Sequence, residues 1–319
     1  MNDQHSNQAF STLARSGFPT IGILGYGNIG RALGQRLADS GRKVIVHDRN
    51  LARIQRELPD NITVSYHIAG LAECDVVFTC LPDDVAVDSV TTGPGGLFGV
   101  LRKGAVHIST STVSPTLSRQ LAAGHLRAGQ TFLVAAILGN PDIVRTGQAF
   151  LLTGGREDVQ QALTPLLQQV AQRIFHVADD SGMASLMKLA CNTLTGVTLQ
   201  SMGEMIALLS KAGIDRQQVF DILTNSMFDG RVHRFYGGKI VNDGHLAPGM
   251  AATLALKDFA LAMAEAEQRQ VPMPLAGMVH ARLMKLQADG LGALDWSVLG
   301  AVAAQDAGLE VKLPARQRS

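Results

Sequence analysis

The stretch that decides the fold is Ile21-Gly-Ile-Leu-Gly25-Tyr-Gly27-Asn-Ile-Gly30. It begins with an apolar, β-branched run, and a helical pattern over 28–40 starts directly after Gly27. The next apolar run, 44–47, ends in the acidic residue Asp48. A strand, a glycine-rich turn and a helix in this order, with an acid after the second strand, are typical of a sheet whose first turn binds a dinucleotide.

Each glycine of this turn has a separate physical task. Gly25 permits the tight turn, Gly27 lets the backbone approach a pyrophosphate, and Gly30 lets the helix pack on the strand. The N–H groups and the positive end of the helix that starts near Asn28 and Ile29 stabilise the anion. We therefore expect these five residues to bind the cofactor.

Asp48 and Arg49 bear on the choice between NAD and NADP, and each residue favours a different cofactor. A carboxylate at the end of the second strand accepts hydrogen bonds from a ribose 2′-hydroxyl, which suits NAD. An adjacent guanidinium suits the 2′-phosphate of NADP. We expect both residues to contact NADP or NAD, with a slight preference for NADP.

The chain divides into an α/β part and an all-α part. Short apolar runs alternate with helical patterns up to about residue 180, which predicts a doubly wound parallel sheet. The expected strands are 20–25, 44–47, 76–80, 106–108, 132–136 and 150–152, and the expected helices are 28–40 and stretches near 114–128 and 156–172. Beyond that point the strand pattern disappears, and one long helical pattern, 183–212, has no proline. We predict an N-terminal Rossmann sheet and a C-terminal all-α domain joined by this long helix. The expected parts are a flexible tail over 1–19, an NAD(P)-binding domain over 20–180, and a helical substrate and oligomerisation domain over 181–319.

Composition narrows the classes of partner. Lys and Arg number 28 against 27 Asp and Glu, so the chain has no excess charge with which to bind nucleic acid. Only 17% of residues are charged, and this low share favours a large core and a homodimer or homotetramer. The three cysteines lack metal-ligand spacing, so we expect no metal and a reducing, cytoplasmic location. No segment is apolar enough for a lipid-facing span, so no membrane is expected.

Five landmarks in order resemble the β-hydroxyacid dehydrogenase family, the relatives of 3-hydroxyisobutyrate and 6-phosphogluconate dehydrogenases. The likeness runs from about residue 20 to 308. The landmarks are the glycine turn 25–30, Cys80-Leu-Pro-Asp-Asp84, Ser111-Thr-Val-Ser-Pro115, Gly182-Met-Ala-Ser-Leu-Met-Lys188-Leu-Ala-Cys-Asn192, and Leu256-Lys-Asp258 before Val271-Pro-Met-Pro-Leu275.

The fourth landmark carries the chemistry that the resemblance implies. Lys188 and Asn192 are four residues apart and so share one helix face. An ammonium among apolar residues is costly to bury, and burial lowers the pKa of a lysine toward the range of proton exchange. By resemblance, the reaction is an oxidoreduction at CH–OH, in which a hydride passes between a nicotinamide and a small hydroxy or carbonyl substrate. The resemblance implies that Lys188 is the general acid/base and that Asn192 orients either the substrate or the lysine. The resemblance also implies cofactor contacts from Leu81, Pro82, Thr112 and Lys257.

The substrate loop departs from the family. Where the family has Asp-Ala-Pro-Val-Ser-Gly-Gly, this chain has Val134-Ala-Ala-Ile-Leu-Gly-Asn140 and then Pro141. Thr112, Gly139 and Asn140 remain the expected substrate contacts, beside a more apolar surface at Leu138. Imine reductases share such an apolar stretch and a proline, although they usually replace the lysine. An imine reductase and a non-catalytic dinucleotide-binding sensor therefore stay open as alternatives.

Overall fold

The computed structural model describes residues 19–50, 54, 58–247 and 249–314. The chain forms two compact units, and the division between them falls after Lys188, inside one long helix. Of the expected tail, 1–19, only Pro19 lies among the described residues.

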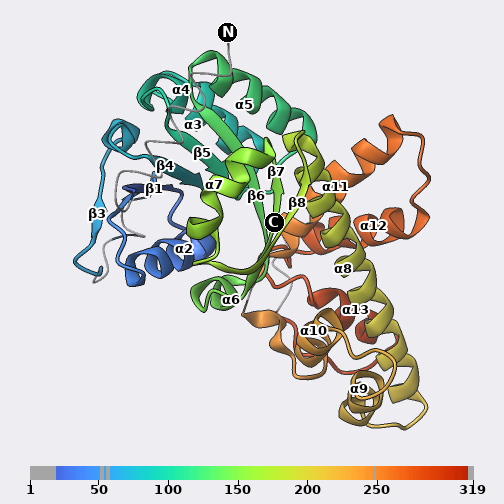
Figure 1. Ribbon diagram of the computed structural model, residues 1–319. Coiled ribbons are helices and arrows are strands. Elements are labelled where there is room, and N and C mark those ends of the chain that lie inside the picture. The colour runs from blue at the N-terminus through green and yellow to red at the C-terminus, as the bar shows by residue number, and fades with distance from the viewer. Residues whose placement is uncertain (1–18, 51–53, 55–57, 248, 315–319) are drawn as a thin grey trace. The chain divides into compact units, whose positions relative to one another are not determined.

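The first unit is built on an eight-stranded sheet (Figure 1) in the order β3-β2-β1-β4-β5-β6-β7-β8. Neighbouring strands are parallel except β6 and β7, which run antiparallel. The strands are β1 (Ile21–Leu24), β2 (Val44–His47), β3 (Ile62–Val64), β4 (Val76–Thr79), β5 (Val106–Ser109), β6 (Thr131–Leu138), β7 (Ala149–Gly154) and β8 (Ala171–Ala178).

Helices cover both faces of this sheet (Figure 1), as the alternating pattern predicts. One face packs against α2 and α7 through the core that contains Leu33 and Leu163. The other face packs against α4 through a second core that contains Leu97 and Leu101. The helices are α2 (Asn28–Asp39), η2 (Ile68–Leu71), α3 (Asp84–Thr92), α4 (Leu97–Val100), α5 (Pro115–Arg127), α6 (Pro141–Arg145) and α7 (Glu157–Leu167).

The central strands of the sheet are buried on both faces. Every residue of β1, β4 and β5 is buried, and their apolar, β-branched residues fill the space on each side. The expected strands 20–25, 44–47, 76–80, 106–108, 132–136 and 150–152 all find their counterparts here. The expected Rossmann class is confirmed.

The helix expected near 156–172 is present but shorter, and the strand that follows it was not expected. Helix α7 ends at Leu167, and β8 begins at Ala171. This strand lies at the edge of the sheet and exposes polar residues such as Gln172 and Arg173. These polar and charged residues interrupt the strand, so its sequence lacks the continuous apolar run of the central strands.

The second unit is helical. Helix α8 (Ser181–Lys211) begins in the first unit and continues into the second, and it matches the long helical pattern expected over 183–212. The other elements are α9 (Arg216–Thr224), α10 (Arg231–Val241), η3 (Gly244–Leu246), α11 (Ala252–Gln268), α12 (Pro274–Ala288) and α13 (Val298–Asp306). Their core surrounds the fully buried Phe259 and Trp296. The structure thus confirms an α/β part followed by an all-α part.

Two helices of this unit pack backbone to backbone. A Cβ placed on Gly203 of α8 would lie 2.4 Å from the Cα of Gly300 on α13. A residue with a side chain at position 203 would block this approach, and a Cβ on Gly300 would lie 2.6 Å from the side chain of Ile240. Among the described helices, none is long and apolar enough to cross a membrane.

Candidate cofactor and active site

At two positions of the first turn, neighbouring backbone atoms leave no room for a side chain. Gly25 has a φ of +97°, and a Cβ there would lie 2.5 Å from the carbonyl oxygen of Cys80. A Cβ on Gly30 would lie 1.9 Å from the carbonyl oxygen of Gly25. These contacts fix the turn after β1 and set the start of α2 tightly beneath it.

Gly27 has no such neighbour. Its φ of −73° suits any residue, and a Cβ there would meet nothing within 4 Å. The side chain of this N-cap residue cannot cap α2, and the first turn of α2 holds no acidic side chain. The turn therefore leaves an open space at the positive end of a helix, which fits the pyrophosphate of a dinucleotide. Asn28 is exposed beside this space, and Ile29 is half-buried.

Asp48 is less available than the sequence suggests. Its Oδ2 accepts a hydrogen bond from the backbone N–H of Tyr26 at 2.8 Å, and its Oδ1 accepts one from Asn50 at 2.8 Å. The residue is 7% exposed, whereas Arg49 beside it is exposed. The carboxylate thus holds the glycine turn to the end of β2, and the guanidinium faces outward.

Hydrogen bonds join the loops that follow β4 and β5. Ser111 Oγ accepts a hydrogen bond from the N–H of Leu81 at 2.8 Å. The Cys80 thiol lies 3.1 Å from the Thr110 hydroxyl, and burial raises the pKa of this thiol to about 12, so it stays protonated. The two loops bring Leu81, the exposed Pro82 and the half-buried Thr112 to the carboxyl end of the sheet, next to the glycine turn.

The expected substrate loop follows β6. Asn140 is the N-cap of α6, and its Oδ1 accepts a hydrogen bond from the N–H of Ile143 at 2.9 Å. Its side-chain oxygen therefore stabilises the short helix. Gly139 is exposed at the turn, and Leu138 is half-buried where the family has a serine.

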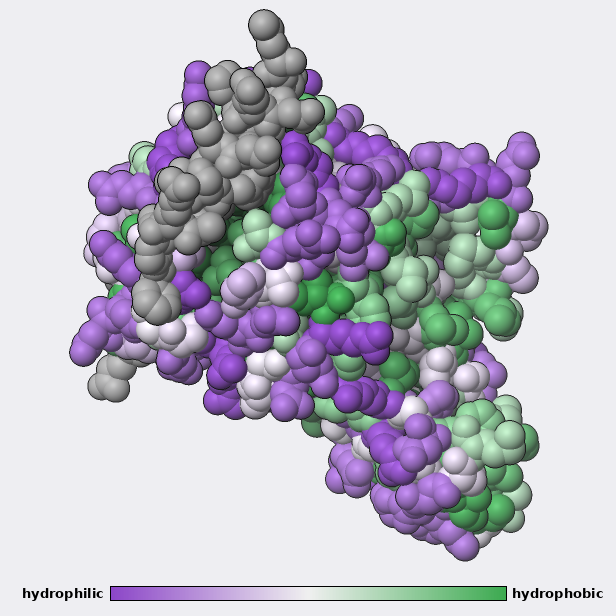
Figure 2. Space-filling model, viewed as in Figure 1, coloured by the Kyte–Doolittle hydropathy of each residue, from purple (hydrophilic) through white to green (hydrophobic). Residues whose placement is uncertain are grey.

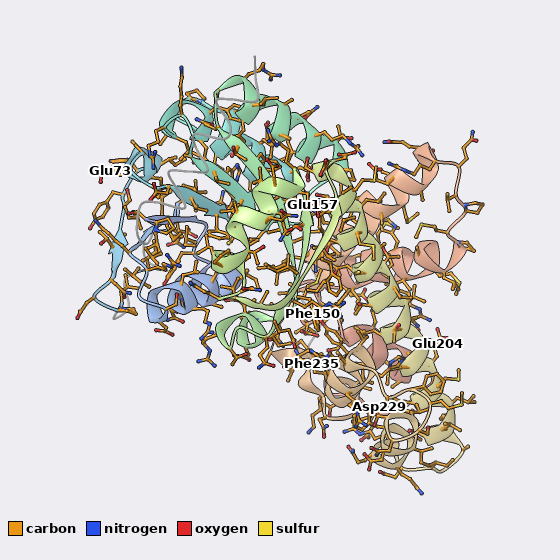
Figure 3. The ribbon with its side chains drawn as sticks, viewed as in Figure 1. Glu73, Phe150, Glu157, Glu204, Asp229 and Phe235 are labelled. Carbon is orange, nitrogen blue, oxygen red and sulfur yellow. The ribbon has the colours of Figure 1, made fainter. Side chains whose placement is uncertain are left out.

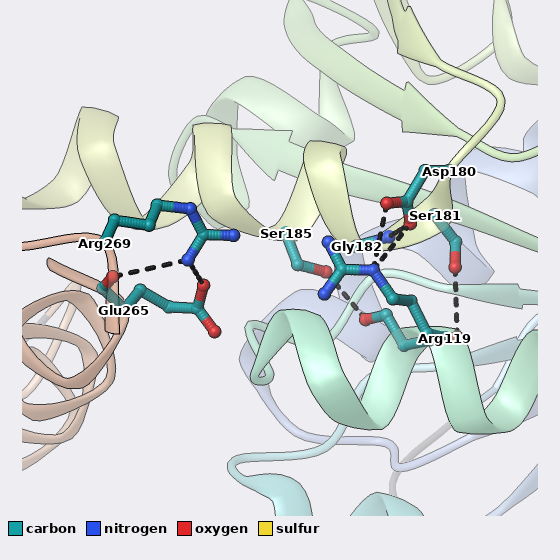
Figure 4. Close-up of polar contacts among 8 residues, drawn as sticks. Arg119, Asp180, Ser181, Gly182, Ser185, Glu265 and Arg269 are labelled. Atoms are coloured by element: carbon teal, nitrogen blue, oxygen red, sulfur yellow. Dashed lines mark hydrogen bonds and ion pairs between the residues drawn. The ribbon is translucent and has the colours of Figure 1, made fainter. Parts of the chain in front are cut away.

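The first turns of α8 are attached to α5 in the first unit (Figure 4). The Arg119 guanidinium pairs with Asp180 at 2.9 Å, and the hydroxyls of Ser118 and Ser185 lie 2.7 Å apart. Ser181 donates a hydrogen bond to the carbonyl oxygen of Ser118. These contacts fix the start of the helix that carries Lys188, which lies half-buried two turns further on.

Asn192, Lys257 and Asp258 form a polar cluster in the second unit. The sequence indicated a role for the first two of these residues but none for Asp258. The amide Nδ2 of Asn192 donates a hydrogen bond to Asp258 Oδ2 at 2.6 Å, and Lys257 Nζ lies 2.9 Å from Asp258 Oδ1. Asp258 is 1% exposed. The carboxylate therefore connects two of the expected site residues. Its only signal in the sequence was its place in the fifth landmark, next to Lys257.

The described residues contain no group of three or more His, Cys, Asp or Glu side chains that could hold a metal ion.

Comparison with known proteins identifies the class. Residues 20–178 match the NAD binding domain of 6-phosphogluconate dehydrogenase, and residues 182–302 match the NAD-binding family of NADP-dependent 3-hydroxyisobutyrate dehydrogenase. An uncharacterised oxidoreductase of Bacillus subtilis, YfjR, is 31% identical over 88% of this chain and 98% of its own. The 2-(hydroxymethyl)glutarate dehydrogenase of Eubacterium barkeri is 27% identical over 91% of this chain and 97% of its own.

Solved structures agree on the fold. The 3-hydroxyisobutyrate dehydrogenase of Salmonella typhimurium superimposes with a TM-score of 0.80 at 22% identity, over 89% of this chain and 99% of that one. An imine reductase from Pseudomonas sp. is more distant, with a TM-score of 0.60 at 16% identity over 90% of this chain and 99% of that one.

The fold and the matches define an NAD(P)-dependent oxidoreductase that acts on CH–OH groups. The chain belongs to the β-hydroxyacid dehydrogenase family. The use of NAD or NADP that the glycine turn predicts is thereby confirmed.

Proposed function

We propose that Lys188 is the general acid/base of this oxidoreductase and that Asn192 assists it. The position of Lys188 carries the proposal: it lies half-buried on α8, one helical turn before Asn192. A side chain that is partly withdrawn from water can change its protonation state with a bound substrate.

Proton and hydride leave the substrate separately. In oxidation, the neutral amine of Lys188 accepts the hydroxyl proton as the carbinol carbon loses its hydride and becomes a carbonyl. In reduction, the ammonium of Lys188 returns the proton to the carbonyl oxygen. The nicotinamide of a bound dinucleotide accepts or supplies the hydride.

The substrate is a small hydroxy acid or the corresponding carbonyl compound. The relatives named as 2-(hydroxymethyl)glutarate and 3-hydroxyisobutyrate dehydrogenases support this class. We propose that Thr112, Gly139 and Asn140 contact the substrate. Since Asn140 Oδ1 caps α6, its contribution is through its backbone or its Nδ2. Leu138 supplies an apolar surface, which favours a substrate with an apolar end.

We propose that the glycine turn with Asn28 and Ile29 holds the pyrophosphate, and that Leu81, Pro82, Thr112 and Lys257 complete the contacts. Domain roles follow: 20–180 binds the dinucleotide, and 181–319 serves the substrate and oligomerisation. Arg49 is exposed while both oxygens of Asp48 accept backbone hydrogen bonds, which favours NADP over NAD.

Substitution of Lys188 by methionine tests the proposal. Since general acid–base catalysis contributes typically 10²- to 10⁴-fold, Lys188→Met is expected to lower kcat by about that factor. The Kd for NADPH and NADH, measured by fluorescence titration, stays within twofold of wild type by our estimate. Lys211→Met, at the last residue of the same helix, is the matched control. Undiminished turnover in Lys188→Met would remove this lysine from the mechanism.

Reduction of cyclic imines is the second candidate activity. Leu138 and Pro141 give the loop after β6 an apolar character, and imine reductases share the fold. A panel of hydroxy acids, carbonyl compounds and cyclic imines, assayed at a fixed concentration of NADP(H), separates the two activities. Members of the family named as dehydrogenases favour the hydroxy acid, and they favour an enzyme over a sensor.

We also propose a homodimer or homotetramer in the cytoplasm. Hydrophobic residues gather on the surface over α8 and α9 (Figure 2), where Leu194 is 69%, Leu208 60% and Ile222 58% exposed. Apolar patches of this kind mark interaction surfaces. Light scattering of wild type and of Leu194→Glu/Leu208→Glu tests whether this surface joins two copies.

A further inference from the structure

A buried carboxylate holds the Asn192 amide in one orientation. Asp258 lies on α11 and is 1% exposed. It receives the Asn192 Nδ2 hydrogen bond at 2.6 Å and pairs with Lys257 at 2.9 Å. All three residues belong to the second unit.

Burial of this charge needs both of its partners. An isolated carboxylate is expensive to remove from water, and it persists inside a protein only when it is paired and hydrogen-bonded. The Lys257 ammonium supplies the opposite charge, and the Asn192 amide supplies a charge-assisted hydrogen bond. Asp258 Oδ2 is thus hydrogen-bonded to Asn192, and Asp258 Oδ1 lies within ion-pair distance of Lys257.

The carboxylate determines which end of the amide faces it. An ionised Asp only accepts hydrogen bonds, whereas the amide of Asn has a donating nitrogen and an accepting oxygen. Asn192 must present its nitrogen to Asp258, so its oxygen is turned the other way. A neutral partner at 258 would accept either orientation.

We propose that Asp258 is a positioning residue, which acts through Asn192 by fixing the carbonyl oxygen of that amide as the end offered to the reacting groups. Lys257 is the counter-ion of Asp258. This inference rests on the proposed function, because it requires Asn192 to assist Lys188. It extends that function by giving the reaction a residue that touches neither substrate nor cofactor.

Side-chain NMR tests the geometry without any turnover. In protein labelled with ¹⁵N-asparagine, the Asn192 amide signal is assigned through Asn192→Gln. We expect Asp258→Asn to move this signal and to increase the solvent exchange of its protons, because the charged acceptor is lost. An unchanged Asn192 signal in Asp258→Asn would overturn the inference whether or not the enzyme turns over.

Kinetics test the consequence. Misplacement of a catalytic group can cost about 100-fold, so we expect Asp258→Asn to lower kcat by roughly 10- to 100-fold with a smaller change in KM. The matched control is Glu265→Gln, a buried carboxylate on the same helix that pairs with Arg269 (Figure 4) and does not contact Asn192. We expect this control to keep kcat within twofold, by the usual size of effects away from a site.

Combination with Asn192→Ala shows whether the two residues act as one. If Asp258 acts only through Asn192, the Asn192→Ala/Asp258→Asn double variant is no slower than Asn192→Ala alone. Multiplied effects, or a normal kcat in Asp258→Asn, would overturn the positioning role. Failure of the proposed function has a different result: wild type itself then oxidises no hydroxy acid, while the NMR experiment still reports on Asp258.

Discussion

The backbone N–H of Tyr26 donates a hydrogen bond to the carboxylate of Asp48 at 2.8 Å. This bond ties the glycine turn after β1 to the end of β2. Because the other carboxylate oxygen accepts the Asn50 N–H, Asp48 shapes the turn from within, and Arg49 is the neighbour that reaches solvent. The two residues should therefore affect cofactor binding in different ways.

Asp48→Ala should raise the Kd of NADH and the Kd of NADPH by the same factor. It leaves the buried N–H of Tyr26 without its acceptor, which costs about 1–3 kcal/mol of folding free energy. Arg49→Ala should instead raise the Kd of NADPH by roughly tenfold, the loss of a charged hydrogen bond, and leave NADH unchanged. Fluorescence titration with both cofactors measures this. An equal effect of Arg49→Ala on NADH and NADPH would contradict the assignment of Arg49 to the 2′-phosphate.

Substitution of Gly27 should affect mainly cofactor binding, whereas substitution of Gly30 should affect mainly the stability of the fold. A Cβ on Gly27 meets no neighbour, so Gly27→Ala should cost below about 1 kcal/mol of stability, the loss of a glycine N-cap, yet raise the Kd of both cofactors tenfold or more. A Cβ on Gly30 collides with the Gly25 carbonyl, so Gly30→Ala should lose about 1–3 kcal/mol. Urea unfolding and cofactor titration measure the two effects. Wild-type affinity in Gly27→Ala would show that the open space is not the pyrophosphate site.

Two histidines inside the first unit form a chain of hydrogen bonds. Gln130 Nε2 donates to two backbone carbonyls, so its Oε1 accepts from His125 Nδ1 at 2.7 Å. His125 Nε2 then accepts from His107 Nδ1 at 2.7 Å, and His107 Nε2 accepts from the Thr79 hydroxyl at 2.9 Å. Both rings are fully buried and neutral in this order. Burial lowers the pKa of His125 to about 4. The pKa of His107 lies well below its usual range, because this ring is buried and because a charge on His125 would repel a charge on it.

This chain predicts an acid-sensitive fold. The folded pKa values lie below the ordinary 6.5 of histidine, so the unfolded chain binds more protons as the pH falls below 6.5. The contribution of these two histidines to the free energy of unfolding should be constant above pH 6.5. The free energy of unfolding should decrease as the pH falls from 6.5 toward 4. Urea unfolding from pH 7.5 to pH 4.5 measures it. His125→Gln should flatten this dependence and His67→Gln, at an exposed site, should not; an equal slope in wild type and His125→Gln would contradict the prediction.

Gly203 should be essential to the helical unit. Gly203→Ala would press a methyl group against the backbone of Gly300 and should cost about 1–3 kcal/mol. Gly277 on α12 is the matched control, because a Cβ there meets nothing within 4 Å. Gly277→Ala should instead raise stability by about 0.5–1 kcal/mol, since alanine restricts the unfolded chain. Thermal unfolding measures both, and equal midpoints would show that α8 and α13 can move apart at no cost.

The glycine turn made most of the first unit predictable from sequence. Its spacing is typical of a strand before it and a helix after it. The short apolar runs that follow in the sequence indicate the other buried strands of the sheet. Strands β3 and β8 could not be found in this way, because β3 has three residues and β8 is a half-exposed edge. Helix α10 was missed as well; its charged start, near the labelled Asp229 and Phe235 (Figure 3), has the composition of a loop.

The candidate site was predictable where local geometry decides it. The glycine turn follows from its motif, and the shared helix face of Lys188 and Asn192 follows from their spacing. The roles expected of these two residues rest on the family resemblance instead. The link between Asn192 and Asp258 joins positions 66 residues apart in the chain, and nothing in the sequence indicates that contact. The capping roles of Asp48 and Asn140 also depend on backbone partners, which only the folded chain reveals.

The reversal of direction between β6 and β7 has a consequence for how this enzyme can change. Leu138 at the end of β6 pairs with Phe150 (Figure 3) near the start of β7, so the sheet closes again directly after the intervening segment 139–148. Insertions or exchanges there need not shift the register of any strand. Directed evolution toward new substrates can therefore vary the exposed positions of this segment, such as Asp142 and Arg145, whereas Val144 has to stay apolar because it is buried in the core that α6 shares with α2.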